Sequence, residues 1–124
     1  MSVTILIVED TPANTRLLSV MLGTASYQVL AATTAQEGIA LARSAQPALI
    51  LMDVQLPTMN GLEATALLKA DPLTASIPII AVTAFAMKGD EEKIRAAGCD
   101  DYLSKPVRHQ TLLQAVSRAL ASHS

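Results

Sequence analysis

The chain has 124 residues, 51% of them hydrophobic, which is enough for one domain with its own core and too few for a second. Nine basic against eleven acidic side chains give a formal net charge of −2, so the basic excess that direct nucleic-acid binding needs is missing. No apolar run approaches the ~20 residues of a membrane-spanning helix, so no membrane association is expected. One cysteine, Cys99, excludes an internal disulfide framework, and the start carries no basic signal-peptide region. We expect a single cytoplasmic domain over residues 1–124, with no output domain.

Short β-branched and aliphatic runs alternate with longer segments of helical period along the whole chain. The expected strands cover residues 3–8, 27–30, 48–52, 77–82 and 102–103. The expected helices cover residues 12–23, 35–45, 62–70, 90–97 and 112–121. Such alternation is typical of βαβ units, so the sequence predicts an α/β fold with five parallel strands flanked by five helices.

Residues that start or stop helices support these boundaries. Thr11 is expected to cap the first helix, with Pro12 at its first position, where a missing N–H costs nothing. Gly23 and Gly98 are expected to close the first and fourth helices, and Pro47 stops the second.

Polar side chains follow four of the expected strands at the point where each strand ends. Glu9 and Asp10 follow the first strand, Asp53 the third, Thr83 the fourth and Lys105 the fifth. Because the usable crevice of an open parallel sheet lies at the carboxyl ends of its strands, these side chains are expected to meet at one edge.

The three acidic groups need a neutralising partner if the first and third strands are neighbours. At about 4 Å, each pair of like charges would repel by ~4 kcal/mol at an effective dielectric near 20. Mg²⁺ prefers oxygen ligands and keeps part of its shell for water and phosphate. We expect Asp10 and Asp53 to bind it directly, Glu9 through water, and the main-chain carbonyl of Gln55 to complete the protein's share.

A carboxylate beside such an ion can accept a phosphoryl group as a mixed anhydride, and Asp53 is the candidate. Phosphoryl transfer depends mainly on cations and donors around the phosphoryl oxygens. The Lys105 ammonium, the Thr83 hydroxyl and the Ala84 N–H are expected to supply them, and a cis Lys105–Pro106 bond is predicted to aim the lysine inward.

Each of these residues also has an ordinary structural explanation. Glu9 and Asp10 before a helix can serve as a cap and dipole partner, and Asp53 before a proline-containing loop can be turn chemistry. The convergence of four separate strand ends is what favours a joint site.

Four segments together resemble the signature segments of the response-regulator receiver domain, in the CheY-like superfamily. They are residues 7–10 (IVED), 51–61 (LMDVQLPTMNG), 82–84 (VTA) and 104–106 (SKP). Within this family, residues 81–93 and the Gly98-Cys99 pair are similar to stand-alone, DivK-like cell-cycle regulators. Receivers fused to hybrid histidine kinases share much of this segment, so that alternative stays open.

The resemblance implies strand order 2-1-3-4-5 and a role for each matching residue. Asp53 would be the phosphoacceptor, Glu9 and Asp10 the acidic pair for Mg²⁺, and Thr83 and Lys105 the phosphate contacts. Tyr102 would be an aromatic switch residue that moves inward as Thr83 moves toward the phosphate.

The resemblance further implies a single-domain response regulator of a two-component phosphorelay, which catalyses only its own phosphotransfer and dephosphorylation. Its partners would be a histidine kinase or histidine phosphotransfer protein and a downstream protein target, bound through a face with Phe85, Met87 and Tyr102. A monomer or weak dimer is expected. In this family the residues at Gln55 and Phe85 border the phosphoryl group, and the bulky Phe85 predicts slow self-dephosphorylation, although a partner contact is an equal reading.

Three other functions compete with this prediction. A phosphatase of the haloacid-dehalogenase type also uses an aspartyl nucleophile, but its second acid would fall at Gln55. A flavodoxin-like electron carrier would need more than three aromatic residues, and Glu9 and Asp10 would repel its cofactor phosphate. A receiver that binds its partners constitutively, without phosphate, is the third.

Overall fold

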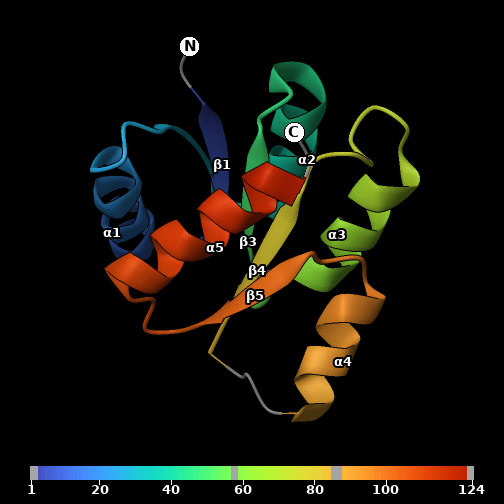
Figure 1. The fold of residues 1–124 in the computed structure, drawn as a ribbon. Coiled ribbons are helices and arrows are strands. Elements are labelled where there is room, and N and C mark those ends of the chain that lie inside the picture. The colour runs from blue at the N-terminus through green and yellow to red at the C-terminus, as the bar shows by residue number, and fades with distance from the viewer. Residues whose placement is uncertain (1–2, 57–58, 85–87, 123–124) are drawn as a thin grey trace.

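Five strands and five helices alternate in the computed structural model, which describes residues 3–56, 59–84 and 88–122 (Figure 1). The strands are β1 (Thr4–Val8), β2 (Gln28–Ala32), β3 (Leu49–Asp53), β4 (Ile79–Thr83) and β5 (Asp101–Ser104). The helices are α1 (Pro12–Gly23), α2 (Ala35–Ala45), α3 (Gly61–Ala70), α4 (Lys88–Ala96) and α5 (His109–Ser122). The predicted alternation is confirmed.

The strands form one parallel sheet in the order β2-β1-β3-β4-β5, as the resemblance implied. From β1 the chain first adds β2 on one side and then adds β3, β4 and β5 in turn on the other side. The strand order therefore reverses between β1 and β3. The register pairs Val8 with Met52 and Asp53 with Val82, which sets the ends of β1, β3 and β4 side by side. A crevice for polar groups is expected at this reversal.

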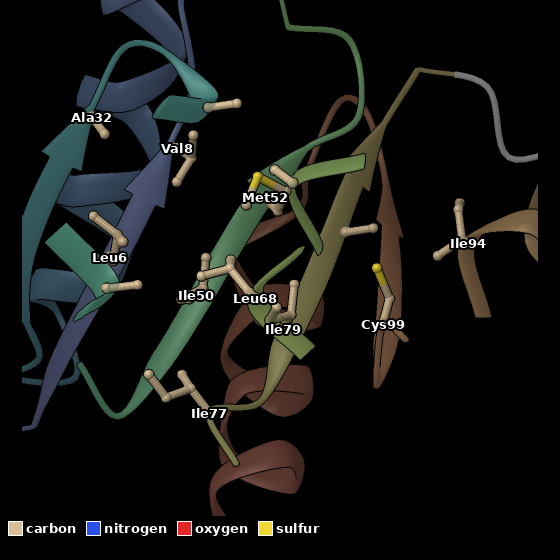
Figure 2. Packing of buried hydrophobic residues seen from close by; sticks show 14 residues of the cluster. Leu6, Val8, Ala32, Ile50, Met52, Leu68, Ile77, Ile79, Ile94 and Cys99 are labelled. Carbon is tan, nitrogen blue, oxygen red and sulfur yellow. The ribbon is translucent and has the colours of Figure 1, made fainter. Parts of the chain in front are cut away.

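Side chains alternate between the two faces of the sheet, because successive residues of a strand point to opposite sides. On one face, residues such as Leu6, Val8, Ile50 and Met52 pack under α2, α3 and α4 (Figure 2). On the other face, Ile5 and its equivalents pack under α1 and α5. Two covered faces explain why the three central strands β1, β3 and β4 are almost entirely apolar.

The observed boundaries differ from the predicted ones where tertiary pairing overrides local preference. β2 continues to Ala32, because Ala31 and Ala32 pair with the end of β1 although alanine has low strand propensity. β4 begins at Ile79 rather than at residue 77, after Pro78, whose missing N–H suits a position before a strand. The helices α4 and α5 begin at Lys88 and His109, earlier than predicted, because their first residues are polar and carry no apolar period.

Within the described ranges, no helix is both long enough and apolar enough to cross a membrane. The one cysteine, Cys99, is a free thiol and is buried in the face covered by α2, α3 and α4.

Candidate functional site

The carboxylates of Glu9, Asp10 and Asp53 meet at the carboxyl ends of β1 and β3. Each offers an oxygen, and the three oxygens lie within 4.8 Å of one another. Glu9 and Asp53 are each only 2% exposed, whereas Asp10 faces solvent. The topology therefore gathers two buried acids and one exposed acid at the strand reversal.

Lys105 brings a positive charge to the two buried carboxylates. Its Nζ lies 3.2 Å from Oδ2 of Asp53 and 3.3 Å from Oε2 of Glu9. The lysine follows β5, and its main-chain N–H donates to the carbonyl of Thr83, which ties the β5 end to the β4 end. The Lys105–Pro106 peptide bond is cis, as predicted.

Glu9 is held by donors from the start of α1. Its Oε1 accepts hydrogen bonds from the side-chain amide of Asn14, at 3.1 Å, and from the main-chain N–H of Thr11, at 3.2 Å. Thr11 occupies the N-cap position, but its side chain makes no capping hydrogen bond, so that part of the prediction is wrong. With Lys105 on its second oxygen, Glu9 is fixed on both sides.

The side chain of Gln55 links the β3 end to the β4 end. The main-chain N–H of Gln55 donates to Oδ1 of Asp53 at 3.0 Å. Its side-chain amide donates to the Thr83 hydroxyl at 3.4 Å and accepts from the Ala84 N–H at 3.5 Å. The predicted phosphate-contacting groups of Thr83 and Ala84 therefore lie beside the loop that follows Asp53.

Gly61, the first residue of α3, packs directly on the backbone of Asp53. Its N–H donates to the carbonyl of Val54, and a Cβ at this position would collide with the main-chain oxygen of Asp53. The side-chain oxygen of Asn60 caps the same helix by accepting from the Glu63 N–H. Glycine is required here because of a close approach, which fixes α3 against the site.

Close packing of the two buried acids shifts the pKa values of both. Burial, a hydrogen bond shared with Glu9 and the charge of Glu9 raise the pKa of Asp53 from 3.8 to about 6. Burial acts in the same direction on Glu9, but hydrogen bonds with Asp53 and Asn14 and the charge of Lys105 outweigh it and lower the Glu9 pKa. Burial would lower the pKa of Lys105, yet the charges of Asp53 and Glu9 raise it.

The donor set suits a hard divalent cation. When all groups are ionised, three carboxylates and one ammonium leave two negative charges (3 − 1 = 2). The atoms that the three acids offer to a metal ion are all oxygens. Mg²⁺ selects such oxygen sets. The residues present therefore fit a magnesium ion.

Tyr102 lies on β5, away from the acidic cluster. Its ring packs under the Arg95 guanidinium, 5.7 Å from the ring centroid, and a hydrogen bond to Glu91 raises the pKa of its hydroxyl. Phe85 and Met87, predicted with Tyr102 as a partner face, lie outside the described residues. The switch role of Tyr102 stays a prediction.

Three contributions were missed by reasoning from the sequence: the Asn14 amide on Glu9, the side-chain bridge of Gln55, and the contact of Gly61 with Asp53. Asn14 lies one helical turn beyond Asp10, which places it at the start of α1 beside the acids. That spacing was the available signal for Asn14, whereas the other two contacts depend on how the loop after β3 folds.

A parallel sheet of this order, with acids and a lysine at its strand reversal, defines the class of protein. The chain belongs to the response regulator receiver domain family, whose pattern matches residues 5–117. It is a receiver-domain response regulator of two-component signalling.

Similar proteins match this chain over nearly its full length. The chain is 43% identical over 120 residues to the polar-differentiation response regulator DivK of Brucella ovis, covering 97% of this chain and 98% of that protein. The receiver domain of sensor histidine kinase PA1611 from Pseudomonas aeruginosa, solved with a magnesium ion in its active-site cleft, is 34% identical, with a TM-score of 0.90 over 98% of this chain and 99% of that one. A CheY-like receiver domain protein from Methanospirillum hungatei is 32% identical, with a TM-score of 0.89 over 99% and 97% of the two chains.

Proposed function

We propose that Asp53 accepts a phosphoryl group from a phosphohistidine of a histidine kinase or a histidine phosphotransfer protein, in a Mg²⁺-dependent reaction. The observation that carries the proposal is the convergence of Glu9 and Asp10 from the end of β1, and of Lys105 from the end of β5, on Asp53 at the end of β3. In the transfer, a carboxylate oxygen of Asp53 forms a bond to phosphorus. The phosphorus–nitrogen bond breaks, and the histidine nitrogen keeps the electron pair.

The metal part of the proposal is supported by the magnesium ion of the related Pseudomonas receiver. In this chain Asp10, Asp53 and the main-chain carbonyl of Gln55 would hold the ion, with Glu9 acting through water. When bound, Mg²⁺ would supply the positive charge that keeps the acids ionised and attracts the phosphoryl oxygens.

The chain's own residues then have separate tasks. Lys105 stabilises the charge that gathers on the phosphoryl oxygens, since its ammonium already lies 3.2 Å from Asp53. The Thr83 hydroxyl and the Ala84 N–H donate to another phosphoryl oxygen. Asn14 keeps the Glu9 carboxylate turned toward the site.

Output takes place through protein binding. Phosphorylation adds about −1.5 to −2 of charge, which draws the Thr83 hydroxyl toward Asp53, and Tyr102 responds by turning inward from its contact with Arg95. The face with Tyr102, Phe85 and Met87 then changes its affinity for a downstream protein. The chain signals in the cytoplasm, as a monomer or weak dimer, rather than turning over a substrate.

Incubation with acetyl phosphate and Mg²⁺ tests the proposal, with intact-protein mass spectrometry as the readout. The wild-type mass should rise by one phosphoryl group. The Asp53→Asn variant, and wild type in excess chelator, should stay unchanged. An unmodified wild-type protein, or equal modification of the variant, would overturn the proposal.

A further inference from the structure

The side chain of Gln55 contacts two groups that are expected to donate to the phosphoryl oxygens, and it occupies the donor of one of them, the Ala84 N–H. Its amide nitrogen donates to the Thr83 hydroxyl and its amide oxygen accepts from the Ala84 N–H. Gln55 belongs to the loop after β3, whereas Thr83 ends β4. The exposed side chain of Gln55 thus joins the loop after Asp53 to Thr83 and Ala84 at the end of β4.

We propose that the Gln55 amide is a lock that holds Thr83 and Ala84 in their phosphate-free arrangement, and that a phosphoryl group on Asp53 displaces it. This inference rests on the proposed function of Asp53. It makes Gln55 a positioning residue, which acts through Thr83 and Ala84.

The geometry of the two hydrogen bonds supports displacement. The Ala84 N–H has one proton to donate, so the Gln55 oxygen and a phosphoryl oxygen compete for it. The amide contacts are long, at 3.4 and 3.5 Å, and involve neutral groups. A hydrogen bond to a charged phosphoryl oxygen is shorter and roughly twice as strong, so the phosphoryl group wins the competition.

The structure also contains a place for the displaced amide. A cavity of about 160 Å³ adjoins Gln55 and Thr83 on the side of α4. Its other lining residues are Val54, Leu62, Asp90, Lys93 and Ile94. Lys93 and Asp90 offer polar partners for an amide, and both belong to α4, so release of the lock changes the contacts of that helix.

Beryllofluoride, a stable phosphoryl mimic, tests the lock by equilibrium binding in saturating Mg²⁺. The variant Gln55→Met keeps the main chain and the length of the side chain but removes both amide contacts. Its affinity for beryllofluoride should be roughly threefold to tenfold higher than that of wild type, because two weak hydrogen bonds no longer favour the free state. The exposed Gln114→Met on α5 is the matched control and should bind as wild type.

The amide proton NMR signal of Ala84 reports directly on the acceptor of its N–H. Without beryllofluoride, this signal in Gln55→Met should lie upfield of its wild-type position, because the N–H loses the Gln55 acceptor, whereas beryllofluoride should move it downfield in both proteins. Gln55→Ala should reproduce both effects, which guards against altered packing of methionine. Equal or weaker binding by both variants, or an unmoved Ala84 signal, would overturn the lock. A wild-type protein that binds no beryllofluoride would instead overturn the proposed function.

Discussion

At the scale of single residues, Asp53 is the group whose environment is most at odds with its charge. It is buried beside Glu9, and its pKa is raised to about 6 although Lys105 lies 3.2 Å away. One lysine is too little positive charge for the cluster. Without a bound cation, the ionised cluster therefore lowers the unfolding free energy of the domain relative to a neutral cluster.

The first prediction concerns the stability of Asp53→Asn without divalent cations. A carboxyl whose pKa is higher in the folded state destabilises the fold as the pH rises from the unfolded value, near 4, through the folded value of about 6. At pH 8 the variant should therefore be more stable than wild type by roughly 1–3 kcal/mol. The difference should largely vanish by pH 4. Urea unfolding in chelator measures it.

The control for this prediction is Glu92→Gln, which removes an exposed carboxylate from α4. It should change the unfolding free energy little at either pH. A variant at Asp53 that is less stable than wild type at pH 8 would show that the lysine already balances the buried charge.

A second prediction concerns Gly61. In Gly61→Ala the new methyl group collides with the main-chain oxygen of Asp53, so α3 or the β3 end must move. We expect a loss of roughly 1–3 kcal/mol in unfolding free energy and slower phosphorylation by acetyl phosphate. Gly23→Ala at the end of α1 is the matched control, since nothing lies within 4 Å of its Cβ. Equal behaviour of the two variants in both assays would refute the contact.

At the scale of elements, helix caps fix the loops that carry the site. α2 is capped by Thr34, which accepts from the Glu37 N–H at 3.1 Å, and α3 by Asn60, which accepts from the Glu63 N–H at 2.9 Å. The two caps are chemically alike. Only the second ends the loop that begins at Asp53.

This difference gives a third prediction. Asn60→Ala and Thr34→Ala should each lower the unfolding free energy by about 1 kcal/mol. Only Asn60→Ala should also weaken beryllofluoride binding, because it frees the loop between Asp53 and α3. Chemical denaturation and a binding titration check the pair. Weaker beryllofluoride binding in both variants, or in neither, would contradict a specific role of the Asn60 cap in holding the site.

The extent to which the fold follows from the sequence differs between elements. The predicted range of α2, residues 35–45, coincides with the structure because a capping threonine and a left-handed residue, Gln46, bound its apolar stripe. The ends of β2 and the starts of α4 and α5 were misplaced, because strand pairing and polar first turns set them. The acids and the lysine were predictable, since the topology fixes strand ends. The side-chain contacts of Gln55 depend on the conformation of the loop after β3 and were not, whereas the spacing of Asn14 from Asp10 offered a signal for its contact with Glu9.

At the scale of the whole molecule, the fold holds together groups that would otherwise repel. Both faces of the sheet are buried under helices, and this packing supplies the stability that offsets the acidic cluster. A cation that binds the folded state alone should therefore stabilise the entire domain.

The fourth prediction follows from this linkage. Mg²⁺ at one hundred times its dissociation constant should raise the unfolding free energy by about 2.7 kcal/mol. Asp10→Asn should remove most of this gain while leaving the metal-free fold intact, because Asp10 is exposed. Thermal unfolding across a Mg²⁺ titration measures both. A variant that responds to Mg²⁺ as wild type does would exclude Asp10 from the site.

The most direct test of the central claim is to locate the phosphoryl group chemically. Borohydride reduces an acyl phosphate of aspartate to homoserine, which marks the modified position. After reaction with acetyl phosphate and Mg²⁺, peptide mass spectrometry should find homoserine at position 53 and at no other aspartate. Homoserine at another aspartate, or a phosphoryl group on a side chain that borohydride leaves unchanged, would contradict the account.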